Sequence, residues 1–116
     1  MAYLGSYAFG RGYEVKQAVV DSLVAAGGTA IAAVTGKRIA VVQMAIGTDT
    51  ANGSAIFRSA SAAGAVLSAE YFLQAIRSSI FPAGTFPYFV TNVGELLHVV
   101  VGQTFSGHFW YIEADA

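Results

Sequence analysis

The chain has 116 residues, of which 55% are apolar and only 11% charged, with a formal net charge of −1 and no cysteine. This length suits one domain with a core that needs no disulfide or metal, and the near-neutral charge argues against electrostatic binding to nucleic acid. No window of about 18 apolar residues is free of charges, glycine clusters or turn signals, so we expect no membrane span. The low share of charged residues predicts an apolar or small and neutral surface, which is typical of proteins covered by copies of themselves or by another protein.

Residues 1–13 differ from the rest of the chain because aromatic side chains alternate with glycines, without strand or helix regularity. The aromatic residues are Tyr3, Tyr7, Phe9 and Tyr13. We interpret this segment as an extended N-terminal arm that docks on a neighbouring molecule and precedes a domain over residues 14–116. A chain end folded onto its own domain explains the pattern equally well. The segment lacks the basic start and apolar run of a signal peptide, so we expect the chain to stay or assemble where it is made.

Side chains that alternate with period two predict β-strands in the first half of the domain. Residues 14–24 fit either helical or strand spacing, and their β-branched content favours a strand. Residues 29–34 form a further strand, which leads through the tight basic turn at residues 35–38 into a strand over residues 39–46. These turn residues include Lys37 and Arg38.

We expect residues 54–59 to form a hairpin with residues 39–46. The connecting Asn52-Gly53 is a good source of positive φ for a turn. The next segment, residues 65–77, fits a short helix or a strand, and its Tyr-Phe-Leu run favours a strand.

Prolines 82 and 87 break the chain before a short strand over residues 88–91, because proline donates no hydrogen bond to a sheet. Residues 95–101 and 108–112 form the last two strands, and the segment between them is expected to close a hairpin. The sum is seven or eight short antiparallel strands about ten residues apart. This spacing predicts a single all-β domain, either a β-sandwich or a jelly roll.

No motif for catalysis, nucleotide binding or metal binding is present. Gly10-Arg11-Gly12 lacks the third glycine and the preceding strand of a dinucleotide site. His98 and His108 are the only histidines, and we expect each to pack in or beside the sheet with one hydrogen bond rather than bind a metal. The sequence gives no reason to expect that any two of Glu70, Glu95 and Glu113 converge into a catalytic pair. We therefore expect a protein without enzymatic activity, metal or cofactor.

The last strand carries a dense group of aromatic residues whose faces follow from alternation. Phe109 and Tyr111 share one face, and His108, Trp110 and Ile112 share the other. Core packing explains at least one of these faces. The other is available to meet a subunit.

Three segments carry a family resemblance. They are AAVTGKRI at residues 32–39, GELL at residues 94–97 and GHFWYIE at residues 107–113. Their order resembles that of small virion proteins of tailed bacteriophages, in which A-A-V-T-G-K-[KR]-I leads into a strand, G-E-x-L opens a late strand and G-H-x-x-Y-[IV]-E closes the domain. The resemblance covers roughly residues 19–61 and 88–113, and the arm and residues 62–87 depart from it.

The resemblance implies a β-sandwich decoration or cement protein that binds the outside of an expanded capsid, often as a trimer. Its expected partners are the major capsid protein and further copies of itself, with no nucleic acid or membrane. We expect it on the outer capsid surface of a virion assembled in the host cytoplasm. The expected contact residues lie in the arm and the basic turn: Tyr3, Tyr7, Phe9, Arg11, Tyr13, Lys37 and Arg38.

A second hypothesis comes from a different class of protein. Similar domains occur in other phage surface appendages, and the alternative function is a carbohydrate- or receptor-binding β-sandwich module of a phage fibre, spike or tail. That hypothesis predicts an exposed aromatic shelf with affinity for glycans, whereas a cement protein binds capsids.

Overall fold

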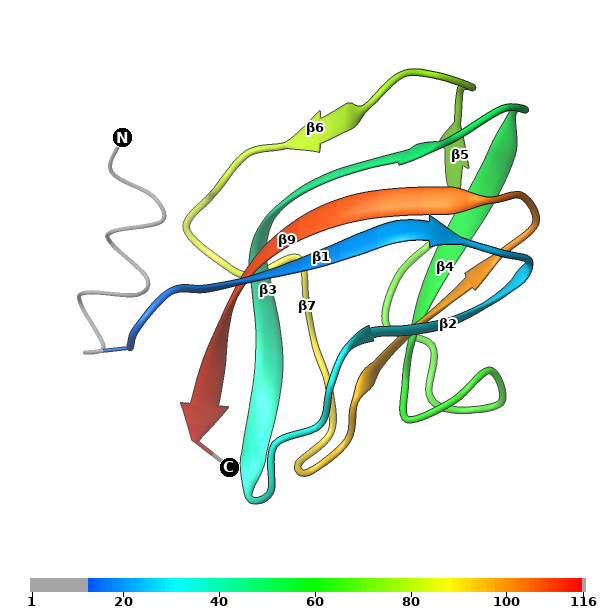
Figure 1. The fold of residues 1–116 in the computed structure, drawn as a ribbon. Coiled ribbons are helices and arrows are strands. Elements are labelled where there is room, and N and C mark those ends of the chain that lie inside the picture. Colours follow the sequence, from blue (N-terminus) through cyan, green and yellow to red (C-terminus); the bar gives the residue numbers. More distant parts are fainter. Residues whose placement is uncertain (1–12, 116) are drawn as a thin grey trace.

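The computed structural model describes residues 13–115, which form nine β-strands and no helix (Figure 1). Accordingly, this part of the chain holds no helix that could span a membrane. The strands are β1 Lys16–Leu23, β2 Ala26–Ile31, β3 Lys37–Thr48, β4 Gly53–Ser59, β5 Tyr71–Leu73, β6 Ser79–Phe81, β7 Phe89–Val90, β8 Leu97–Val101 and β9 Phe105–Asp115. The all-β prediction is confirmed.

The strands make two antiparallel sheets. Sheet A has the order β1-β9-β3-β6, with β7 also paired to β3, and sheet B has the order β2-β8-β4-β5. Figure 1 shows the long strands β1, β9 and β3 of sheet A curving side by side. Strands that are neighbours within each sheet are mostly distant in sequence, so the fold depends on long-range pairing.

Both predicted hairpins are wrong, although the strands themselves are present. Strand β3 belongs to sheet A and β4 to sheet B, and the chain likewise passes from sheet B to sheet A between β8 and β9. Turn residues show where the chain reverses, and alternation shows which side chains face inward. Neither signal says to which sheet an inward-facing strand belongs, because both sheets face the same core.

The turn before β4 also differs from the prediction. Neither Asn52 nor Gly53 has a positive φ, and Gly53 is the first residue of β4. Instead the side chain of Asn52 acts in the turn, because its Oδ1 accepts a hydrogen bond of 2.9 Å from the backbone N of Ala75. The asparagine thereby ties the β3–β4 connection to the β5–β6 connection.

The ambiguous segments resolve as strands. Residues 16–23 form β1 rather than a helix, and residues 71–73 form the short β5. The ninth strand, β6, was not predicted, because its three residues, Ser79–Phe81, are too few for an alternation signal. It exists through pairing with β3, where Ile80 lies opposite Ala45.

The core lies between the two sheets. The ring of Phe57 on β4 stacks on Phe89 of β7 with centroids 4.6 Å apart, and it meets the edge of Phe109 on β9 at 5.8 Å. Phe57, Phe105 and Phe109 are fully buried. Each such side chain contributes about 2 to 3 kcal/mol through burial, so this aromatic contact helps to hold the two sheets together.

A second, smaller apolar cluster lies on the outer face of sheet A. Ala40 and Ile112 lie opposite each other on β3 and β9, and both are fully buried. Tyr13 and Val15 pack against them. The residues just before β1 therefore cover one end of the outer face of sheet A.

Candidate interaction surfaces

The basic turn between β2 and β3 lies at the end of sheet A where β9 finishes. The turn is closed by a hydrogen bond of 3.1 Å from the backbone N of Lys37 to the carbonyl O of Val34. Gly36 occupies its third position with a φ of 75°, a conformation that glycine adopts without strain. The turn places Lys37 and Arg38 at the start of β3, where they meet the last residues of β9.

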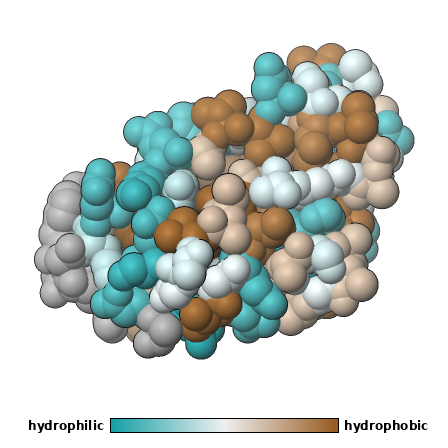
Figure 2. Space-filling view, turned by 60° about the horizontal axis from the view of Figure 1, so that its bottom comes forward, coloured by the Kyte–Doolittle hydropathy of each residue, from teal (hydrophilic) through white to brown (hydrophobic). Residues whose placement is uncertain are grey.

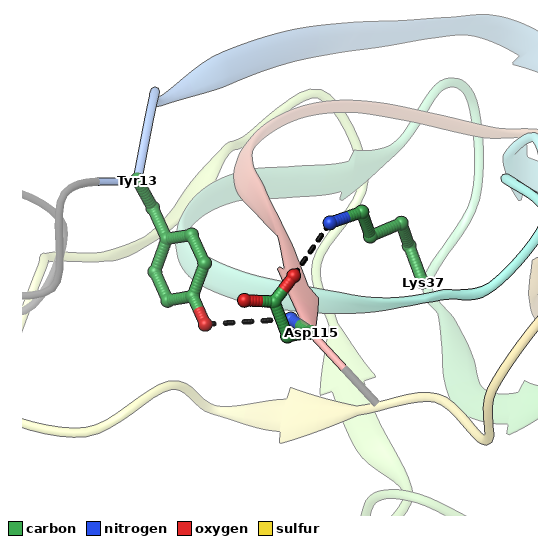
Figure 3. Close-up of polar contacts among 3 residues, drawn as sticks. All are labelled: Tyr13, Lys37 and Asp115. Atoms are coloured by element: carbon green, nitrogen blue, oxygen red, sulfur yellow. Dashed lines mark hydrogen bonds and ion pairs between the residues drawn. The ribbon is translucent and has the colours of Figure 1, made fainter.

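The polar groups of this turn are bonded within the chain. Lys37 Nζ lies 2.5 Å from Asp115 Oδ1, and the backbone N of Asp115 donates a hydrogen bond of 3.3 Å to the hydroxyl of Tyr13 (Figure 3). The hydrogen bond and the charge of Asp115 raise the pKa of Lys37. Arg38 donates a hydrogen bond of 3.2 Å from Nη1 to the carbonyl O of Thr91.

Three of the predicted contact residues, Tyr13, Lys37 and Arg38, are thus brought together at one end of the domain. Because Lys37 is paired with Asp115, its charge gives less guidance to a partner than the sequence suggested. The other predicted contact residues lie outside the described part of the chain: Tyr3, Tyr7, Phe9 and Arg11.

The outer face of sheet B is almost without charge. The strand register places eight residues on the outward side, of which only Arg58 is charged: Gly27, Thr29, Ser54, Ile56, Arg58, Phe72, His98 and Val100. Ile56 lies opposite Val100, and Phe72 on the edge strand is 81% exposed. We call these eight residues the sheet B face. The space-filling view shows one face of the molecule, with brown hydrophobic side chains at the surface among white and tan ones and teal hydrophilic side chains mainly towards the left (Figure 2).

His98 lies on the sheet B face between Thr29 and Arg58. Burial lowers its pKa from the ordinary value of 6.5, and the nearby charge of Arg58 lowers it further. Arg58 itself donates a hydrogen bond of 2.9 Å from Nη1 to the carbonyl O of Gly64. The predicted hydrogen bond is found for His108 but not, among the described residues, for His98.

The outer face of sheet A carries an aromatic pair. The rings of His108 and Trp110 stack with centroids 4.0 Å apart and planes 3° from parallel. His108 Nε2 lies 2.8 Å from Gln17 Oε1, and because an amide oxygen only accepts, Nε2 carries the hydrogen. The predicted faces of this strand are confirmed for Phe109, which is buried inward, and for this outward pair.

The same face is hollowed beyond this pair. A hollow of about 290 Å³ is lined by Val19, Val20, Asp21, Ala45, Ser78, Ser106, Gly107 and His108. A second hollow of about 370 Å³ is lined by Asp21, Gly47, Thr48, Asp49, Ile76, Arg77, Ser78 and Ser106. Because Asp21, Ser78 and Ser106 line both, the two hollows form one depression, which we call the sheet A groove.

A hydrogen-bond network fixes one wall of the groove. Asp49 accepts hydrogen bonds from the hydroxyls of Ser22 at 2.9 Å and Ser106 at 2.8 Å. The backbone N of Ser22 donates to the hydroxyl of Ser106 at 3.0 Å, and Ser22 has a φ of 55° at an irregularity in the pairing of β1 with β9. The irregular end of β1 is thereby held beside the groove.

Sequence reasoning missed both the sheet B face and the sheet A groove. Their residues come from four strands or from separate turns, so only the pairing of the strands brings them together. Among residues 13–115, no group of three or more histidine, aspartate or glutamate side chains could hold a metal ion. Comparison of the chain with protein-family models, curated proteins and solved structures finds no match.

Proposed function

We propose that this chain is a structural protein of a tailed bacteriophage, a cement or decoration protein that binds the outer surface of the capsid. It acts as a homo-oligomer, with a trimer as the working assignment, and its partner is the major capsid protein. It stabilises the shell against the outward pressure of packaged DNA by bridging neighbouring capsid subunits. This role requires binding and no catalysis.

The observation that carries the proposal is the sheet B face. Phe72 is 81% exposed, Ile56 and Val100 on this face are half-buried, and Arg58 is its only charged side chain. Apolar surface removed from water contributes about 25 cal/mol per Å². An exposed sheet face of this composition supports an extended contact with protein, because large apolar patches on soluble domains mark interaction sites.

The strand order supports assignment of the fold as a jelly-roll sandwich. With β6 and β7 both paired to β3, the orders β1-β9-β3-β6 and β2-β8-β4-β5 follow the pattern of two interlocked Greek keys. Jelly rolls are common in viral capsid proteins and in lectins. Fold alone therefore supports a virion role without deciding it.

Repetition makes modest contacts sufficient. A shell presents the same site many times, and an oligomer that engages several sites at once gains effective concentration for each further contact. Bridging two capsid subunits then opposes their separation, even where one contact alone is weak.

The test is co-sedimentation of the full chain with expanded capsids that lack it, with the number of bound copies counted per capsid. The proposal predicts saturation at a fixed number compatible with capsid symmetry and greater resistance of the loaded capsid to heat. Absence of binding contradicts it.

The contribution of the arm is tested in the same assay with a chain that lacks residues 1–12. Deletion should stop at residue 12, because Tyr13 packs on Ala40 and Ile112. An arm that contacts the capsid predicts weaker binding with an unchanged thermal unfolding midpoint. Unchanged binding removes Tyr3, Tyr7, Phe9 and Arg11 from the contact.

A further inference from the structure

We propose that the sheet A groove binds a neutral sugar unit of a glycan. This inference goes beyond attachment to a capsid and does not depend on it. The groove lies on the face opposite to the sheet B face, so a copy that uses sheet B for contact with protein keeps the groove open.

The size of the groove suits a small ligand. Its two hollows measure about 370 and 290 Å³ and share three lining residues. Pockets for small molecules begin at about 300 Å³. The groove is therefore in the size range of a small-molecule site, and it is shallow enough to admit one unit of a longer chain.

Small residues and one close backbone approach make the hollow. Ala45 and Gly47 follow each other on the outward side of β3, and Ser106 lies opposite Gly47 on β9. A β-carbon at Gly47 would lie 2.3 Å from the carbonyl O of Arg77. Glycine at this position allows the β5–β6 connection to cross the end of β3, and this crossing forms the far wall.

The charged side chains that line the groove disfavour an anionic ligand. Both oxygens of the Asp49 carboxylate already accept hydrogen bonds from serine hydroxyls. Asp21 keeps its acceptor capacity, because the nearby Ser22 hydroxyl lies 3.4 Å from it and donates its one hydrogen to Asp49 at 2.9 Å. Arg77 has no ion pair within residues 13–115. Asp21, Asp49 and Arg77 together give the groove a net charge of −1, which disfavours an anion, and among residues 13–115 no three acidic or histidine side chains could hold a metal ion.

Sugar hydroxyls match this set of polar groups because each hydroxyl both donates and accepts. A carboxylate such as Asp21 accepts, a guanidinium such as Arg77 donates, and the hydroxyl of Ser78 does both. The C–H face of a sugar ring is apolar and requires an apolar wall. Val19, which is 68% exposed, and the ring of His108 supply that wall in the adjoining hollow.

The aromatic pair makes this wall rigid. Trp110 stacks on His108 at 4.0 Å and Gln17 holds the imidazole at 2.8 Å, so the ring has little freedom to lose when a ligand packs on it. We assign positioning of the imidazole to Trp110 and Gln17, and contact with the sugar to His108, Asp21 and Arg77.

Trp110 is the only tryptophan in the chain, so its fluorescence reports on the stack beside the groove. The experiment titrates the full chain separately with glucose, galactose, mannose and N-acetylglucosamine. It records Trp110 fluorescence and, as an independent readout, the backbone amide NMR signals of Gly47 and Ser106. The proposal predicts saturable changes with at least one sugar.

Two variants and one control locate the binding. Asp21→Asn and Arg77→Gln should each raise the sugar concentration at half-saturation about tenfold, because each variant loses a hydrogen bond to a charged group. Glu70→Gln changes an exposed carboxylate that precedes β5 in sheet B, and it should leave the titration unchanged. Circular dichroism establishes that all three variants are folded.

Three results would overturn the proposal. The first is no saturable change in either readout with any of the four sugars. The second is binding by Asp21→Asn and Arg77→Gln that equals binding by the original chain. The third is that Trp110 fluorescence and the amide signals of Gly47 and Ser106 change with protein concentration and not with sugar. That result would show that the groove contacts a second copy of the chain. Capsid binding is measured separately, so none of these results alters its outcome.

Discussion

The outer faces of sheet A and sheet B are built by the same alternation of side chains, yet they differ in shape and polarity. On sheet A, Tyr13 and Val15 cover one end and the groove opens at the other. On sheet B, the outward side chains leave an apolar face with Arg58 as its only charge. One domain thus presents a surface suited to extended contact with protein and another suited to a small polar ligand.

The largest expected loss of stability separates two isoleucines, both of which point away from the core between the sheets. Ile112 is fully buried beneath Tyr13 and Val15, whereas Ile56 is only partly buried on the sheet B face. Ile112→Ala should lower the free energy of unfolding by about 2 to 5 kcal/mol, and Ile56→Ala by about 1 kcal/mol. Urea denaturation measures both. Equal losses would contradict the claim that the two faces are covered differently.

The next effect concerns the floor of the groove. Gly47→Ala places a β-carbon 2.3 Å from the carbonyl O of Arg77, so the β5–β6 connection must move. We expect a loss of about 1 to 3 kcal/mol in the free energy of unfolding. Gly102→Ala is the matched control, because a β-carbon there meets no atom within 4 Å. If both variants unfold at the same urea concentration, the close approach does not shape the groove.

The sheet B face should respond to acid through His98. Burial and the charge of Arg58 lower its folded-state pKa below 6.5, so the unfolded chain binds a proton first as pH falls. This contribution to stability is complete above pH 6.5 and declines as pH falls towards the lowered pKa.

Urea denaturation between about pH 7.5 and about pH 5 measures this decline. His98→Gln should reduce the loss of unfolding free energy as pH falls. His108→Gln on sheet A should leave the contribution of His98 to that loss unchanged. An unchanged slope in His98→Gln would assign the acid response to another group.

The smallest effect is expected at the basic turn, where Lys37 and Asp115 form an exposed ion pair. Asp115 raises the pKa of Lys37 above its ordinary value of 10.5, so the stabilisation is present below pH 10.5 and is lost as pH rises through the raised pKa. Lys37→Gln should lower the thermal unfolding midpoint slightly at neutral pH and not in strong alkali. A difference that persists in alkali would show that packing, rather than charge, stabilises this end.

Strand positions and side-chain faces were the parts of the fold that sequence could predict. Alternation placed Phe109 inward and His108 with Trp110 outward, because neighbours on a strand point to opposite sides. The sheet partners were not predictable in this way. Strand β9 lies between β1 and β3, and the pairing of Lys16 with Tyr111 joins residues from opposite ends of the chain.

The groove depends on the same unpredicted pairing. Asp21, Asp49 and Arg77 come from β1 and two separate connections, and no short motif links them. Gly47 could not be recognised from turn signals. A glycine is needed there because the backbone of Arg77, distant in sequence, lies close to it in the fold. The basic turn was predicted from Gly36, but its partner Asp115 could be identified only once β3 and β9 were paired.

The central claim is that the sheet B face contacts protein on the capsid while the sheet A groove stays open. Hydroxyl-radical footprinting of the free and capsid-bound chain tests it most directly. The account predicts that oxidation of Ile56, Phe72 and Val100 falls on binding and that oxidation of Val19 and Trp110 does not. Protection of Val19 and Trp110 with Phe72 still reactive, or no protection at either face, would contradict it.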